Sequence, residues 1–94
     1  MSKTAMSDDL GSIRSGMTGI FRKVLVDDQF TLRDDMTPDD VDGWDSMTSV
    51  SLVLEINAFF GIDLEVIDMI EMREDRKTIA ALALLIQQKI RAKA

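Results

Sequence analysis

Apolar residues recur three or four positions apart near the start of the chain. They are Leu10, Ile13, Met17, Ile20, Phe21, Val24 and Leu25. This spacing forms one stripe on a helix, so it predicts a helix that begins near Asp8 or Asp9. Acidic side chains suit that position because a helix N-terminus carries partial positive charge. The polar residues 1–7 are expected to be disordered.

Residues 27–43 lack this periodicity and are predicted to form a long loop. The loop is mostly polar and acidic. Four apolar residues interrupt it and are expected to anchor it to the helices: Phe30, Leu32, Met36 and Val41. Thr37 followed by Pro38 matches an N-cap and a first helical residue, which predicts one short helical turn. A loop of this length in a small domain is usually functional or tied down.

A second helix is predicted from Ser46 to Phe60. Gly61 is expected to end it, since glycine adopts the left-handed conformation found after many helices. At 100° per residue, one arc of this helix is assigned to the core: Val50, Val53, Ile56 and Phe60. The opposite arc is expected to face solvent: Thr48, Ser51 and Glu55. A further stripe beside Ser46 is largely apolar: Met47, Leu54 and Ala58.

Two more helices are predicted in the last third of the chain. A short one runs from about Glu65 to Met72, and a longer one starts after the N-cap Thr78 and reaches about Lys89. The core stripe of the longer helix is Ile79, Leu82, Leu85 and Ile86. Three long helices and one short one predict an all-α fold, an antiparallel four-helix bundle with a long loop between its first two helices.

Composition narrows the possible classes of protein. The 94 residues correspond to one domain, 1–94, and a hydrophobic content of 46% is normal for a folded chain. Cysteine and histidine are both absent from the sequence. Disulfides, a thiolate nucleophile, a Ser-His-Asp triad and histidine metal sites are therefore excluded within this chain.

Charge and hydropathy bear on partners and location. The net charge of −6 disfavours binding to a nucleic-acid phosphate backbone. The longest apolar run, Ile79 to Ile86, is far shorter than the roughly 20 residues of a membrane-spanning helix. We therefore expect no nucleic-acid partner and no membrane insertion. No apolar run near the start resembles a signal peptide, so a cytoplasmic location is expected. We also expect the protein to be a monomer.

The acidic loop can be compared with a calcium-binding EF-hand loop. Aligning Gly43 with the glycine of that motif places Asp40 and Asp42 at ligand positions. Pro38 and Ser49 then occupy the first and last ligand positions, where neither supplies the required carboxylate. We therefore predict no metal site.

An enzyme is the weakest interpretation of the sequence. Asp42 and Asp45 are the nearest approach to a carboxylate pair for acid–base catalysis. Nothing in the sequence places them around a pocket, so no catalytic residue is predicted.

The pair Asp45-Ser46 is the most informative polar feature of the chain. On local grounds, such a pair before an amphipathic helix is most often a helix cap. Here Gly43 and Trp44 precede the pair, and a long acidic loop leads to it. A largely apolar helix follows and ends in Phe-Gly-Ile at residues 60–62.

Together these residues resemble the acyl carrier protein family. That family has Asp-Ser-Leu at the start of its second helix and a Phe-Gly-Ile type of ending at its close. This chain has Asp45-Ser46-Met47 and Phe-Gly-Ile at residues 60–62. The Gly-Trp-Asp-Ser variant is similar to that of carrier proteins in specialised lipid, polyketide or peptide pathways. The resemblance covers about residues 10–90.

The resemblance implies that Ser46 is the attachment site of a 4′-phosphopantetheine arm. A separate phosphopantetheinyl transferase, for which Asp45 is part of the recognition motif, would move the arm from coenzyme A. Acyl groups would be carried as thioesters on the thiol of the arm, and the protein itself would not be an enzyme. The phosphodiester on Ser46 is expected to face unsatisfied backbone N–H groups at the helix start.

Partner enzymes implied by the resemblance are a loading ligase and downstream synthases or transferases. Glu55 is the only carboxylate of the predicted second helix after Ser46, so docking is expected to use apolar residues of this helix and acidic residues elsewhere. Those acidic residues are Asp42, Asp68, Glu71 and Glu74. The candidate docking residues are Trp44, Met47, Val50, Ser51 and Leu54. Trp44 is alternatively a plug that fills the space under the loop, which we favour because large aromatic side chains usually bury area.

Two alternatives stay open at this level. The first is an aminoacyl carrier protein loaded by an adenylating ligase; a sizeable apolar interior would favour acyl cargo instead. The second is an unmodified helical interaction module in which Ser46 only caps the second helix. In that case Ser46→Ala would cost about 0.5–2 kcal/mol of stability through the lost cap.

Overall fold

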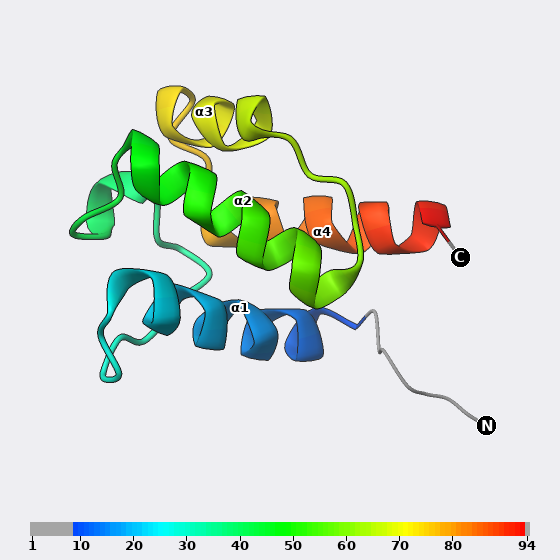
Figure 1. Cartoon of the computed structure of the whole chain (residues 1–94), viewed down its shortest axis with the longest axis horizontal. Helices are drawn as coiled ribbons and strands as arrows, with labels where there is room; N and C mark the ends of the chain where they lie inside the picture. The colour runs from blue at the N-terminus through cyan, green and yellow to red at the C-terminus, as the bar shows by residue number, and fades with distance from the viewer. Residues whose placement is uncertain (1–8, 94) are drawn as a thin grey trace.

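The structure, a computed structural model, describes residues 9–93. Within this range all regular elements are helical and there is no strand, which confirms the all-α class (Figure 1). The elements are α1 (Leu10–Leu25), the 3-10 turn η1 (Pro38–Asp40), α2 (Ser46–Phe60), α3 (Val66–Glu74) and α4 (Ile79–Lys93). The segment 1–7, expected to be disordered, lies outside the described residues.

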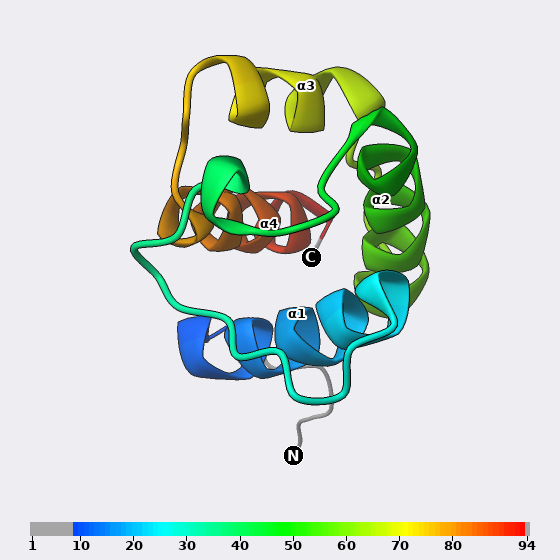
Figure 2. The same cartoon turned by 90° about the vertical axis from the view of Figure 1, so that its left-hand side faces the viewer.

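The helices enclose one hydrophobic core. α1 contacts both α2 and α4, and α2 also contacts α3. In Figure 1, α1 and α2 run in opposite directions, and α4 runs opposite to α1. Figure 2 shows the linker between α1 and α2 passing the start of α4 and reaching η1, which contacts α3. The linker therefore touches elements that follow it in the chain.

The ends of the helices follow the local chemistry predicted from sequence. Asp9 caps α1, where its carboxylate accepts a hydrogen bond of 3.1 Å from the Ser12 amide. Gly61 ends α2 in the left-handed conformation, with φ of 67°. The Thr78 hydroxyl accepts a bond of 3.3 Å from the Ala81 amide at the start of α4. α3 and α4 extend beyond their predicted ends, to Glu74 and Lys93.

The buried face of α2 differs from the predicted one. Val50, assigned to the core, is 42% exposed, whereas Leu52, left out of the predicted arc, is completely buried. The buried positions of the helix are Ser49, Leu52, Val53, Ile56 and Phe60. α2 is apolar around most of its circumference, so hydrophobicity alone does not select the arc. Leu10 of the predicted α1 stripe is also exposed, because it lies at the open end of that helix.

The linker is anchored by the apolar residues predicted for that role. Leu32, Met36 and Val41 are buried, and Phe30 is half-buried. The ring of Phe30 stacks on that of Phe21 in α1, with centroids 6.0 Å apart. The short helical turn predicted after Thr37 is present as η1.

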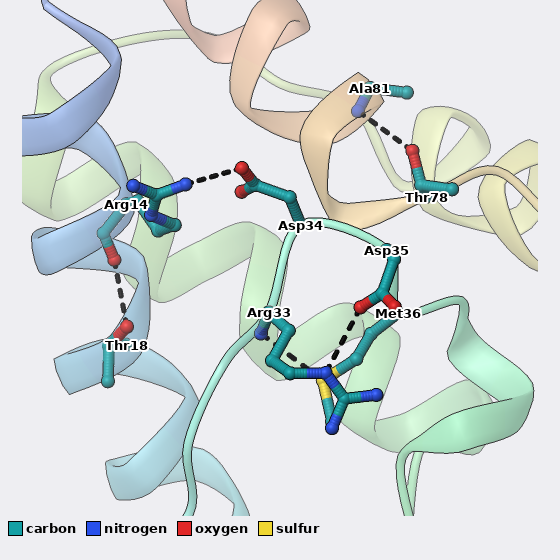
Figure 3. Close-up of polar contacts among 8 residues, drawn as sticks. All are labelled: Arg14, Thr18, Arg33, Asp34, Asp35, Met36, Thr78 and Ala81. Carbon is teal, nitrogen blue, oxygen red and sulfur yellow. Dashed lines mark hydrogen bonds and ion pairs between the residues drawn. The ribbon is translucent and has the colours of Figure 1, made fainter.

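Linker backbone also completes the first turn of α4. The Ile79 amide donates to the Met36 carbonyl at 2.8 Å, and the Ala80 amide donates to the Asp34 carbonyl at 3.1 Å. The carboxylate of Asp34 also pairs with Arg14 of α1 (Figure 3). Helix N-termini otherwise leave such amides without a partner inside the helix. The linker thus ties α1 to the start of α4.

Candidate functional site

Trp44 fills the space beneath the junction between the linker and α2. Its side chain is only 6% exposed and packs edge-on against Phe21, with ring centroids 5.3 Å apart. The plug interpretation is therefore confirmed. The placement of Trp44 among the docking residues is corrected, because a buried indole offers almost no surface to a partner.

Ser49 is the polar partner of this indole. The residue is 1% exposed, and its hydroxyl accepts a bond of 2.9 Å from Trp44 Nε1 and donates one of 3.1 Å to the Asp45 carbonyl. Every polar group of the contact is paired, as buried polar groups require. The pattern of apolar residues did not predict this role of Ser49. The available signal was a serine one helical turn after Asp45, on the same side of α2 as Val53 and Ile56.

Asp45, and not Ser46, is the N-cap of α2. Its carboxylate accepts a bond of 2.8 Å from the Thr48 amide. Hydrogen bonds from the Thr48 amide and side chain, with smaller contributions from the amides of Asp45 and Met47, lower the pKa of Asp45 below its ordinary value of 3.8. The Thr48 hydroxyl also lies 2.6 Å from the carbonyl of Gly43, whose positive φ of 85° favours glycine. Asp45 is therefore a fixed negative charge beside Ser46.

Ser46 is the first residue of α2 and is exposed. Its hydroxyl does not cap the helix, which corrects the structural role that the interaction-module alternative gave it. The contact it makes is with α3, where Arg73 Nη1 donates to Ser46 Oγ over 3.4 Å. The hydroxyl of Ser46 therefore lies at the surface, while Asp45, Trp44 and Ser49 stabilise the start of the helix.

Exposed apolar side chains surround this serine along α2. Met47 is 80% exposed and Leu54 is 65% exposed, and Val50 and Ser51 are exposed between them. These four docking candidates share one side of the helix, since they recur at helical spacing. The neighbouring helix α3 adds exposed apolar residues that sequence analysis did not assign to docking: Val66, Ile67 and Ile70.

A groove of about 1000 Å³ runs between α1 and α2. Its apolar and small lining residues are Gly11, Gly16, Gly19, Ile20, Ala58 and Phe59. An ion pair of 2.9 Å between Lys23 and Glu55 lies at its margin. Ser46 does not belong to its lining, so the groove and the serine are separate features of α2.

Residues 9–93 hold no group of three or more acidic side chains able to bind a metal ion. None of the helices in this range combines the length and apolarity needed to cross a membrane.

Comparison of the chain with protein-family models, with curated proteins and with solved structures found no match.

Proposed function

We propose that the protein is a carrier protein whose 4′-phosphopantetheine arm is attached to Ser46. The observation that supports this most directly is an exposed serine at the first residue of α2 that has no capping role. Asp45 caps the helix in its place, and Trp44 with Ser49 holds the junction from below. These contacts stabilise the backbone to which a group on Ser46 would be attached.

The attachment is a group transfer from coenzyme A. Ser46 Oγ attacks the phosphorus that bears the pantetheine, one P–O bond of the pyrophosphate breaks, and adenosine 3′,5′-bisphosphate leaves. The hydroxyl proton passes to a base of the transferase, since this chain has no histidine and the carboxylate of the adjacent Asp45 is a weak base occupied by the Thr48 amide. The carrier itself then acts by tethering cargo near partner active sites, which raises the local concentration of the cargo.

The finer architecture belongs to the same proposal. We infer that the four helices form an antiparallel bundle of the acyl carrier type, with residues 26–45 as the long first loop. The contacts of α1 with α2 and α4, and of α2 with α3, support this arrangement. Partner enzymes would dock on the exposed side of α2 that carries Met47, Val50 and Leu54.

The cargo we favour is an acyl group. The mostly apolar groove between α1 and α2 supplies a surface on which an acyl chain can leave water, and an aminoacyl group needs no such surface. An aminoacyl cargo, loaded by an adenylating ligase, is the alternative. Loading the holo-protein with acyl groups of increasing length distinguishes the two. Acyl cargo predicts a stability that rises with chain length, and aminoacyl cargo predicts no such trend.

A second candidate function is an unmodified interaction module. The exposed apolar residues on α2 and α3 favour it, because such patches often mark interaction surfaces. Asp45 provides the cap of α2, and the hydroxyl of Ser46 makes one long, exposed contact with Arg73. We therefore expect Ser46→Ala to change the free energy of unfolding by less than about 0.5 kcal/mol. A loss of 1 kcal/mol or more would favour a structural role for the hydroxyl.

The decisive experiment is the intact mass of the protein after incubation with coenzyme A, magnesium and a broad-specificity phosphopantetheinyl transferase. Wild type should gain one phosphopantetheine and Ser46→Ala none. Ser15→Ala, which alters an exposed serine of α1 outside the docking candidates, is the matched control and should load as wild type does. Absence of loading on folded wild type with several transferases would reject the assignment of Ser46.

A further inference from the structure

Arg73 is brought to Ser46 by the packing of α3 on α2. It lies in the last turn of α3 and is 27 positions from Ser46 in sequence, yet its Nη1 is 3.4 Å from Ser46 Oγ. Its side chain is exposed. Within residues 9–93, no carboxylate forms an ion pair with Arg73, whereas Arg33 and Arg76 each pair with an aspartate. The positive charge of Arg73 is thus available to an anion at Ser46.

The first turn of α2 offers an anion fewer free backbone amides than the N-terminus of a helix usually does. The Thr48 amide is already bound to the Asp45 carboxylate, and the Ser49 amide is bound to the Asp45 carbonyl. The expectation that a phosphodiester on Ser46 would face unsatisfied amides is therefore corrected for these two groups. The fixed negative charge of Asp45 also repels a phosphate on the adjacent residue.

From this geometry we propose that Arg73 binds the phosphate of the arm on Ser46. The proposal rests on the carrier function proposed above. The phosphorus would lie one covalent bond beyond the oxygen that Nη1 now contacts, so its free oxygens come within reach of the guanidinium. The planar guanidinium can donate two parallel hydrogen bonds to phosphate oxygens, which an ammonium group cannot do.

This contact gives Arg73 a positioning role. It offsets the repulsion between the phosphate and Asp45, and it holds the first part of the arm on the α3 side of Ser46. Exposed Ile70 lies one turn earlier in α3, and Met47 follows Ser46 in α2. The arm therefore starts between a cation and exposed apolar side chains of the two helices, which restricts the directions in which it leaves the protein.

The test compares loaded proteins by phosphorus NMR. Wild type, Arg73→Gln, Arg73→Lys and the control Arg76→Gln are loaded with the arm, and intact mass verifies each product. Arg76 is also exposed and its loss changes the net charge equally, but it pairs with Asp39. We expect the phosphodiester resonance to shift in Arg73→Gln, to shift partly in Arg73→Lys and to stay in place in Arg76→Gln.

A second measurement follows the arginine itself in wild type. The guanidinium nitrogen resonances of Arg73 should move between the unloaded and loaded forms, and those of Arg76 should not. This comparison decides the question even if Arg73→Gln is not loaded. Unmoved Arg73 resonances, or one common phosphorus shift in all loaded variants, would overturn the role of Arg73 alone. Wild type that gains no arm would overturn the carrier function together with it.

Discussion

At the scale of single residues, the junction before α2 is held by one buried hydroxyl. Ser49 links the indole of Trp44 to the backbone of Asp45, and so connects the interior of the domain to the residue next to Ser46. A buried hydroxyl of this kind contributes mainly by satisfying groups that would otherwise lack a partner. Removal of the Ser49 hydroxyl is therefore expected to lower the stability of the protein.

Ser49→Ala should destabilise the protein. It leaves the indole N–H of Trp44 without a partner, and an unsatisfied buried donor costs about 1–3 kcal/mol. The measurement is the free energy of unfolding in urea. Ser51→Ala is the matched control, because Ser51 is exposed on the same helix. Equal stability of the two variants would contradict the importance of the buried hydrogen bond.

The charge of Asp45 should make the free energy of unfolding depend on pH in the acidic range. The pKa of Asp45 is lowered in the folded protein, chiefly by the bond from the Thr48 amide, so the ionised carboxylate stabilises the fold above its ordinary pKa of 3.8. That contribution is lost as pH falls below about 4 and through the folded pKa. Asp45→Asn keeps an acceptor oxygen but no charge.

The urea midpoint of wild type and Asp45→Asn, measured from pH 7 to pH 2, checks this expectation. Wild type should be the more stable protein near neutral pH, and the difference should shrink below about pH 4. Parallel profiles over the whole range would show that the charge of Asp45 does not contribute through its helix-cap contacts.

Local chemistry in the sequence predicted part of this site and missed the rest. Asp45-Ser46 was located correctly at the start of α2, because polar residues before an apolar run are typical of helix starts. Arg73 could not be connected with Ser46, since that contact depends on how α3 packs against α2. Ser49 was overlooked because the core of α2 was assigned from apolar residues alone.

At the scale of elements, α1 and α2 approach closely where α1 carries a glycine. A β-carbon on Gly16 would lie 2.7 Å from a ring carbon of Phe59 and 3.0 Å from one of Phe60. The small residue thus sets the distance between the two helices at the end of α2. At Gly19, one turn further along α1, such a β-carbon would have no atom within 4 Å apart from the adjacent residues and the nearby backbone of its own helix.

This pair of glycines provides a matched prediction. Gly19→Ala should stabilise the protein by about 1 kcal/mol, because alanine favours helix over glycine by that amount. Gly16→Ala gains the same propensity but displaces the phenylalanine rings, so it should be less stable than Gly19→Ala by about 1–3 kcal/mol. Thermal unfolding of both variants measures the difference. Equal effects would mean that the rings move at no cost.

The sequence pattern predicts the ends of α2 but not which side of the helix is buried. The ends of α2 were predicted because Phe60-Gly61 and the polar pair before the helix are strong local signals. Its buried face was not, since apolar residues occur around most of the helix and Val50 and Leu52 compete for the core. The contact with Trp44 determines which of the two is buried. The buried indole donates to Ser49, so the side of α2 that carries Ser49 and Leu52 faces the core.

At the scale of the whole molecule, the linker acts as part of the framework. Its backbone binds the first amides of α4, its Asp34 carboxylate pairs with Arg14 of α1, and η1 contacts α3. Sequence analysis predicted the anchoring side chains but not these backbone contacts. A carbonyl has no sequence signature, so its partners emerge only when distant segments are placed together.

Hydrogen exchange should reveal this framework. The Ile79 and Ala80 amides lie in the first turn of α4 but donate to the Met36 and Asp34 carbonyls, so they should exchange slowly. The internal control is the first turn of α1, where Gly11 has no such acceptor among residues 9–93. Exchange at Ile79 as fast as at Gly11 would indicate a linker that detaches from α4 readily.

The burial of Trp44 has a practical consequence for following this protein in solution. It is the single tryptophan of the chain, so the near-ultraviolet emission of the indole arises from one known position. That position lies against Phe21, next but one to Ser46. The emission spectrum therefore acts as a built-in optical probe of the junction, without any attached dye. A partner that loosens the junction would shift the emission to longer wavelength, and one that docks only on the outer side of α2 would leave it unchanged.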